Sequence, residues 1–95
     1  MKIDEIIWQS QFVEKLATKH GIKTTEVEEV LANFPYFRFA SKGKRRGEGV
    51  YSAMGQTNEG RYLIIFFILK PHHRALVISA RDMDKKERRY YGRKG

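Results

Sequence analysis

The stretch RYLIIFFILK, from Arg61 to Lys70, decides how this chain folds. Its interior, from Tyr62 to Leu69, is apolar or aromatic at every position, so a strand here is apolar on both of its faces. Strands of this kind occupy the centre of a sheet, where both faces are covered. We therefore expect residues 61–70 to form a central strand, with the other strands built around it.

Shorter runs of β-branched and aromatic residues flank this strand in the sequence. Turn segments separate them, NEG before the central strand and PHH after it, as expected for hairpins. The expected strands are YFRFAS at residues 36–41, VYSAMGQT at 50–57, RYLIIFFILK at 61–70 and RALVISAR at 74–81. Together they predict a four-stranded antiparallel sheet.

The first third of the chain has a helical pattern. Apolar residues form one stripe of a helix over residues 3–20, although Ile6 to Trp8 could instead be a short extended entry. Gly21 is a typical stop for this helix. A second helix starts with Thr25 and Glu28, which have capping-box spacing, and ends before Pro35. The two helices are expected to form a hairpin.

A last helix is expected near the C-terminus. Asp84 and Glu87 have the capping spacing again, at the start of DMDKKERRYY, and the final GRKG is expected to fray. The predicted fold class is α+β, with two N-terminal helices, a four-stranded antiparallel sheet and a C-terminal helix. At this length the chain is expected to be a single domain over residues 1–95.

The whole chain has a net charge of +8, and its positive charge is concentrated in the later two thirds. Residues 1–34 hold four Lys or Arg against six Asp or Glu, which leaves fifteen against five in residues 35–95. Such a segregated excess favours a polyanionic partner, because cations attract phosphates and release their counterions. The alternative is a surface charged for general solubility.

Several classes of protein are disfavoured by composition. The chain has no cysteine, which removes disulfides, thiolate metal sites and thiol nucleophiles. Its longest apolar run is too short to span a bilayer, so we expect a cytoplasmic protein without a membrane partner. His72 and His73 are adjacent in a turn and His20 is remote, which is not metal-ligand spacing. We therefore expect no metal and no cofactor.

Two arginines are expected at the same end of the sheet. Arg61 begins the third strand and Arg81 ends the fourth, and these strands should run antiparallel. Strand alternation places Arg81 on one face with Ser79 and Val77, so its guanidinium projects from an otherwise apolar surface. This is a suitable position for binding a phosphate.

Further cations and aromatic rings could hold unpaired RNA, because bases stack on aromatic planes and phosphates pair with cations. The candidate RNA-binding residues are Arg88, Arg89, Lys44, Arg45, Arg46, Tyr91 and Trp8. For the tyrosines of the last helix, the alternative is that they pack this helix onto the sheet.

Two motifs resemble a known family. KHGI, Lys19 to Ile22, follows Trp8, and ALVISARDMDKKERRYY, Ala75 to Tyr91, follows an apolar pair of strands. In this order they are similar to the BrnT family of small bacterial toxins, over nearly the whole chain. The chain departs from the family at Gln9 and Ser10, which replace Asp-Pro, and at SKGKRRGEG, which replaces an acidic stretch.

The resemblance implies a RelE-like fold and metal-independent cleavage of RNA, which inhibits translation. It also implies a cognate antitoxin, a BrnA-like DNA-binding protein of ribbon-helix-helix type. Such an antitoxin neutralises the toxin and can hold it on operator DNA.

Cleavage of RNA without a metal assigns roles to specific residues, because the 2′-hydroxyl must lose a proton and the phosphate must be stabilised. Arginine suits the phosphate, so Arg61 and Arg81 are the candidates for this role. The candidates for proton transfer are His20, Lys19 and Glu48. His20 could instead cap a helix end, and Glu48 could instead be a salt-bridge partner.

Two other functions fit the same composition. A basic module that binds nucleic acid without cleaving it would have the same charge distribution, and so would a protein-interaction module with an acidic partner. The first would tolerate the loss of Glu48 and His20, whereas a ribonuclease that uses them would not.

Overall fold

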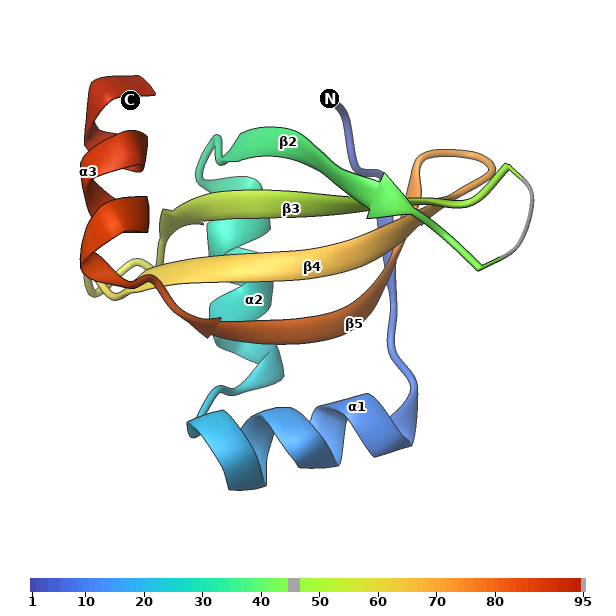
Figure 1. Cartoon of the computed structure of the whole chain (residues 1–95). Coiled ribbons are helices and arrows are strands. Elements are labelled where there is room, and N and C mark those ends of the chain that lie inside the picture. The colour runs from blue at the N-terminus through green and yellow to red at the C-terminus, as the bar shows by residue number, and fades with distance from the viewer. Residues whose placement is uncertain (45–46, 95) are drawn as a thin grey trace.

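The chain folds around a five-stranded mixed sheet, seen in the computed structural model, which describes residues 1–44 and 47–94 (Figure 1). The strands are β1 Glu5–Ile7, β2 Tyr36–Lys42, β3 Gly49–Gln56, β4 Tyr62–Lys70 and β5 Arg74–Asp82. Their order is β1-β5-β4-β3-β2, and β4 is the central strand. Strands β2 to β5 are antiparallel, as predicted, but β1 is added parallel to β5, so the predicted sheet of four antiparallel strands was incomplete.

The N-terminus is extended rather than helical up to Ile7. β1 pairs with β5, with Ile6 opposite Ala75, and the N–H of Asp4 donates to the carbonyl of His73 at 2.8 Å. The prediction of one helix over residues 3–20 was therefore wrong for its first part, and the extended alternative was correct. β-Branched residues such as Ile6 and Ile7 favour a strand wherever a partner strand is available.

The first helical segment begins at Ser10. It consists of α1 Ser10–Lys15 and a π-helical continuation, η1 Leu16–His20. Gly21 ends it in the left-handed conformation with φ of 61°, as its place after the helical pattern predicted.

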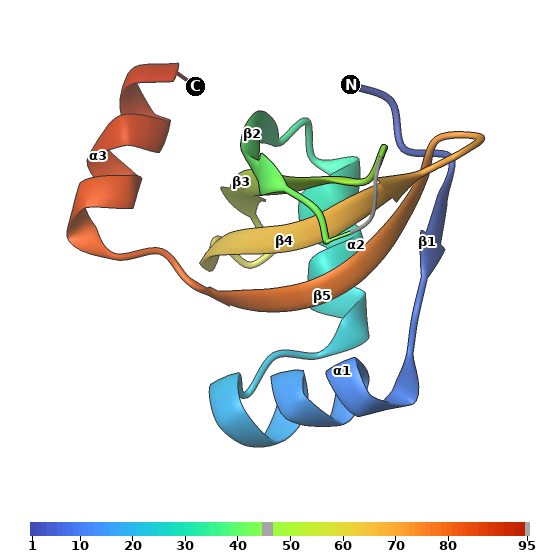
Figure 2. The same ribbon diagram turned by 45° about the vertical axis from the view of Figure 1, so that its right-hand side comes forward.

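The second helix is α2 Thr24–Ala32. Its capping carboxylate is Glu26, which accepts a hydrogen bond from the N–H of Lys23 at 3.0 Å, so the predicted capping by Thr25 and Glu28 was shifted by two residues. In Figures 1 and 2, α2 crosses behind the sheet while α1 lies beneath it. The two helices cross steeply and do not form the expected hairpin.

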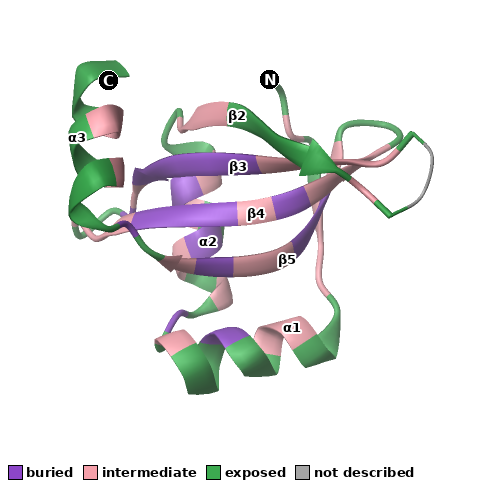
Figure 3. Cartoon of the chain, viewed as in Figure 1, coloured by how far each residue is buried: buried purple, intermediate pink, exposed green. Residues whose placement is uncertain are grey.

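We call the side of the sheet covered by α1, η1 and α2 the back face. Figure 3 shows α2 behind the central strands, where most of the purple, buried residues lie. The main core consists of Leu16, Ile22, Val27, Val30, Ala53, Leu63, Ile65, Phe67, Ala75, Val77 and Ala80. Burial of this apolar area is the main source of stability in the fold.

The opposite side, which we call the front face, carries α3 Lys85–Lys94 at one end (Figure 2). The predicted capping is confirmed, since the N–H of Glu87 donates to Asp84 at 2.7 Å and the N–H of Asp84 donates to Glu87 at 2.9 Å. The helix includes Gly92 to Lys94 of the GRKG segment that was expected to fray, and Gly95 lies outside the described residues. Beneath it lies a smaller core of Met54, Ile64 and Met83, with tyrosines packed around it.

A β-bulge in β5 changes which residues of this strand share a face, so one part of the predicted alternation was wrong. Ser79 pairs with Phe66 and Val77 with Phe67, so Ile78 is an extra residue between them. Val77 therefore points into the main core of the back face, whereas Ser79 and Arg81 lie on the front face. The prediction that Arg81 shares a face with Ser79 is confirmed, and the inclusion of Val77 was wrong.

Replacing Gly21 and Gly92 by alanine should have opposite effects on stability. A Cβ atom at either position meets nothing within 4 Å, so only the backbone conformation differs. Gly21→Ala should lower the free energy of unfolding by about 1 kcal/mol, because alanine is strained in the left-handed region. Gly92→Ala should raise it by about 0.5 kcal/mol through helix propensity. Urea denaturation measures both changes, and two shifts of the same sign would contradict this account.

Candidate functional site

Arg81 is held in place by a bidentate pair with Glu87. Its Nη1 and Nη2 donate to the two carboxylate oxygens at 2.7 and 2.8 Å, which joins the end of β5 to the first turn of α3. The hydrogen bonds from Arg81 hold the pKa of Glu87 below its usual range, and the carboxylate raises that of Arg81. The side chain of Arg81 remains 39% exposed, so it is both oriented and accessible.

Arg61 joins three segments at the same end of the sheet. It donates to Asp82 at 2.8 and 3.0 Å and to Glu26 at 3.3 Å. It also donates to the main-chain carbonyls of His20 and Gly21, at 3.1 and 3.0 Å. These hydrogen bonds, above all those to Asp82, raise the pKa of Arg61, and they lower the pKa of Asp82. Arg61 therefore holds the end of η1 against the sheet.

The predicted neighbourhood of Arg61 and Arg81 is confirmed by the strand register. Ile64 pairs with Arg81 and Leu63 with Asp82, so both arginines lie where β4 begins and β5 ends. His20 belongs to the same end, because its main-chain carbonyl accepts a hydrogen bond from Arg61 at 3.1 Å. Lys19, beside it at the end of η1, is exposed.

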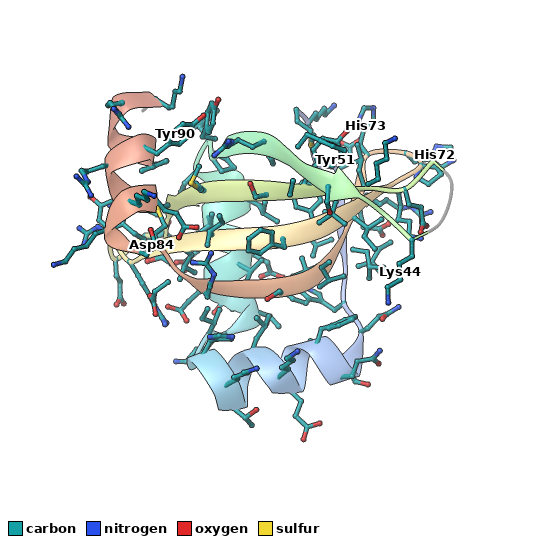
Figure 4. All side chains as sticks on the ribbon, viewed as in Figure 1. Lys44, Tyr51, His72, His73, Asp84 and Tyr90 are labelled. Atoms are coloured by element: carbon teal, nitrogen blue, oxygen red, sulfur yellow. The ribbon has the colours of Figure 1, made fainter. Side chains whose placement is uncertain are left out.

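Glu48 lies at the other end of the sheet. It forms an ion pair with Lys70, the last residue of β4, so the predicted alternative of a salt-bridge partner is what the structure shows. Lys44 is exposed in the same region, and Figure 4 shows it far from Asp84 and Tyr90 along the strands. Arg45 and Arg46 are outside the described residues. The structure therefore does not bring Glu48 and Lys44 together with Arg81.

The outer side of α3 combines a cation with two aromatic rings. The guanidinium of Arg88 lies over the ring of Tyr62, 4.1 Å from its centre, and the ring of Tyr91 meets Tyr62 edge-on at 6.1 Å. These side chains line a groove of about 440 Å³ together with Gln56, Arg89 and Gly92. Of the residues expected to bind RNA, Arg88, Arg89 and Tyr91 are thus brought together.

Sequence reasoning missed a second group at α3. The hydroxyls of Tyr36 and Tyr90 are 3.3 Å apart, and the guanidinium of Arg38 lies 4.5 Å from the centre of the Tyr90 ring. Tyr36 and Arg38 are two residues apart on β2, so alternation places them on one face. That spacing was visible in the sequence, whereas their approach to Tyr90 depends on where α3 docks.

Trp8 does not belong to this end of the molecule. It is half-buried, packs against the main core of the back face, and lines a shallow groove with Asp4, Glu5 and Glu28. A groove with three carboxylates is a poor place for the phosphates of RNA. The structure therefore separates Trp8 from Arg88, Arg89 and Tyr91.

Within residues 1–44 and 47–94, no three His, Asp or Glu side chains are grouped so that they could hold a metal ion. No helix in this part of the chain combines the length and apolar character needed to cross a membrane.

The fold and the charged end together define a small α+β protein with a surface of arginines and aromatic rings. Residues 8–87 match the model of a family described as the ribonuclease toxin BrnT of type II toxin-antitoxin systems. This match covers most of the chain, which therefore belongs to the BrnT ribonuclease toxin family. No curated protein matches the chain.

A solved structure supports the fold. The chain is similar to the Brucella abortus ribonuclease toxin BrnT, known from a crystal structure at 1.1 Å resolution, with a TM-score of 0.60 and 19% identical residues. The similarity covers 88% of this chain and 100% of the other chain. At this identity it shows a BrnT-like fold, and the expected likeness to RelE stays a prediction.

The ion pair of Arg81 and Glu87 should stabilise the folded protein at neutral pH and lose this effect in acid. The pKa of Glu87 is lower in the folded than in the unfolded protein, so the contribution of Glu87 to stability is complete above the ordinary pKa of a glutamate. It is lost as the pH falls through the lower folded value. Glu87→Gln should therefore lower the melting temperature at pH 7, by the equivalent of about 1 kcal/mol.

Thermal unfolding of both proteins between pH 7 and pH 2.5 measures this effect, and the difference should shrink toward the acid end. Glu14→Gln, at an exposed carboxylate on α1, is the control and should change little at any pH. A deficit in Glu87→Gln that does not shrink as the pH falls would show that the ion pair is not its cause.

Proposed function

We propose that this protein is an endoribonuclease toxin of a type II toxin-antitoxin pair, which cleaves RNA without a metal and inhibits translation in the cytoplasm. The observation that carries the proposal is the family match over residues 8–87. That range includes Arg61, Arg81 and Glu87, and the grouping of cations at the α3 end agrees with an RNA substrate.

Arg81 is our candidate for stabilising the reacting phosphate. When the 2′-hydroxyl attacks, the phosphate gains negative charge, and a fixed guanidinium stabilises this charge without rearrangement. Glu87 takes two of the donors of Arg81 and fixes its plane. Guanidinium carries five donors in all, so others remain for phosphate oxygens. This arrangement supports cleavage in which an arginine, rather than a metal, holds the phosphate.

The proton transfers are assigned by position. His20 lies at the same end as Arg81 and is the side chain that ordinarily titrates near neutral pH, so we keep it as a candidate, with Lys19 beside it. Glu48 is paired with Lys70 at the other end of the sheet, which does not support a role in the same step. We propose that Arg61 acts by positioning, because its donors hold the carbonyls of His20 and Gly21.

RNA on either side of the reacting phosphate is proposed to follow α3. Arg88, Arg89 and Tyr91 line one groove there, where cations can pair with phosphates and rings can stack with bases. Lys44 would contact only a longer RNA, since it lies at the other end of the sheet.

The partner is proposed to be a cognate antitoxin, as the family description implies for a type II system. A ribbon-helix-helix protein of the BrnA type, which binds operator DNA, is the form that we expect. Acidic segments of such a protein would be attracted to the same cationic surface as RNA.

Cleavage of RNA by the purified protein should persist in excess EDTA. Arginine stays charged at any working pH, so phosphate stabilisation by Arg81 needs no divalent ion. Gel analysis of RNA incubated with and without the chelator measures the rate. Loss of cleavage in EDTA and its recovery with added magnesium would overturn the metal-independent mechanism.

Replacing Arg81 should separate catalysis from general RNA binding. Arg81→Ala should reduce the cleavage rate by a factor on the order of a hundred or more, the effect of losing one transition-state donor. Arg81→Lys should recover little, because lysine keeps the charge but lacks the planar fork.

The matched control is Arg74→Ala, which removes the same charge at the far end of β5 and should reduce cleavage only a few-fold. Growth of bacteria that express each protein without an antitoxin gives a second readout. If Arg81→Ala and Arg74→Ala lose activity equally and Arg81→Lys is fully active, Arg81 is only one of many phosphate anchors. Intact RNA and normal growth with the unchanged protein would favour a non-catalytic basic module instead.

A further inference from the structure

Four residues form one row across the front face of the sheet. In the register of the strands, Arg38 on β2 lies opposite Ser52 on β3, Ser52 opposite Phe66 on β4, and Phe66 opposite Ser79 on β5. Residues directly opposite in antiparallel strands point to the same side, and their Cβ atoms are about 5 Å apart. An aromatic ring is thus flanked by two hydroxyls, with an arginine at the edge of the row.

Ser52 is largely buried and lines a groove. It is 5% exposed, and among the described residues no fully buried side-chain oxygen or nitrogen lacks a hydrogen-bond partner, so nothing in this part of the chain is left unsatisfied without a ligand. The groove has a volume of about 310 Å³ and lies between the sheet and α3, so the hydroxyl of Ser52 is placed to bind a polar group of a ligand there.

Phe66 is the ring in the middle of the row. It is half-buried at the centre of the sheet, and Figure 3 shows neither α1 nor α2 in front of this face. The guanidinium of Arg81 lies 5.8 Å from the centre of the Phe66 ring. A base on Phe66 and a phosphate on Arg81 can therefore belong to the same nucleotide.

The charges around the row fit a ligand with phosphates on both sides of a base. Arg38, Lys86 and Arg93 line the groove, and its single carboxylate, Glu87, is neutralised by Arg81. A hydrophobic protein segment would not need three cations at its border, whereas each nucleotide of single-stranded RNA combines an apolar base plane with an anion.

We propose that Phe66, Ser52 and Ser79 form a base-recognition subsite for one unpaired nucleotide of RNA. The base stacks on Phe66, the two hydroxyls bind polar groups at its edge, and Arg81 and Arg38 bind the phosphates on its two sides. The subsite sets which base lies next to the cleaved bond. This inference rests on the proposed ribonuclease function and assigns its sequence preference to the front face.

Binding of uncleavable RNA tests the subsite apart from catalysis. Fluorescein-labelled hexanucleotides of A, C, G or U with 2′-O-methyl groups cannot be cleaved through the 2′-hydroxyl, and anisotropy measures their dissociation constants. Phe66→Leu should weaken binding of the preferred sequence about tenfold, the scale of one lost stacking contact. Ser52→Ala and Ser79→Ala should each reduce the preference among the four sequences about fivefold, the scale of one hydrogen bond.

The chain offers matched controls on the other face and at the edge. Phe39→Leu removes an exposed ring that packs on Tyr51 of the back face, and Ser41→Ala removes an exposed hydroxyl. Neither change should alter affinity or preference. Circular dichroism melting of every variant checks the fold, and the serine variants still test the inference if Phe66→Leu unfolds.

Cleavage of ordinary RNA by the unchanged protein is measured alongside. If it cleaves RNA while the three front-face variants bind and discriminate as it does, the inference is overturned and the proposed function stands. If it neither binds nor cleaves RNA, both are overturned. Variants that keep their RNA affinity but lose binding to the antitoxin would assign this face to a protein partner and would also overturn the inference.

Discussion

The guanidinium of Arg61 is the contact on which the arrangement of this end of the molecule depends. It binds the last carbonyls of the first helical segment, a carboxylate at the start of α2 and another at the end of β5. Helix ends leave carbonyls without partners, and a fork of five donors can satisfy several of them at once. One side chain thus sets the position of His20 relative to the strand that carries Arg81. The neighbouring pair of Arg81 and Glu87 fixes α3 in the same way, so the two arginines hold a helix on each side of the sheet.

The two faces of the sheet differ in how much they contribute to stability and in how accessible they are to a ligand. The back face holds eleven buried residues in one core, including Phe67, Val27 and Val30. Among the described residues, the smaller core on the front face has three buried hydrophobic residues, under an α3 that has no buried residue of its own. Stability therefore comes mainly from the back face, where packing is dense and substitutions are costly. The front face is held by tyrosines and ion pairs, which leaves its arginines and hydroxyls open to a ligand.

The sequence predicted well what depends on composition over several residues. The apolar run in residues 62–69 placed β4 at the centre, and turn residues on both sides located its neighbours. The last helix followed from Asp84 and Glu87. The sequence could not show features that depend on small local differences. β1 has only three residues and exists because β5 offers it a partner strand. The bulge at Ile78 leaves no mark in the sequence.

Among the candidate site residues, Arg61 and Arg81 were correctly placed at one end of the sheet because antiparallel pairing requires it. The position of Glu48 was not foreseen, since nothing in its own sequence surroundings indicates Lys70 as its partner.

The bulge in β5 has a consequence for the side of the sheet on which Arg81 lies. The residues before it, Ala75 and Val77, point to the back face, and after it the alternation is reversed, so that Ala80 points back and Arg81 points forward. If β5 paired regularly with Ile78 kept in the ladder, the guanidinium of Arg81 would turn into the core and Ala80 toward solvent. An arginine in that core would be a charge without water, which is far more costly than any single contact described above. The bulge therefore keeps Arg81 outside the core for as long as the strand holds this extra residue, and deletion of Ile78 alone would leave Ala80 and Arg81 on their present faces.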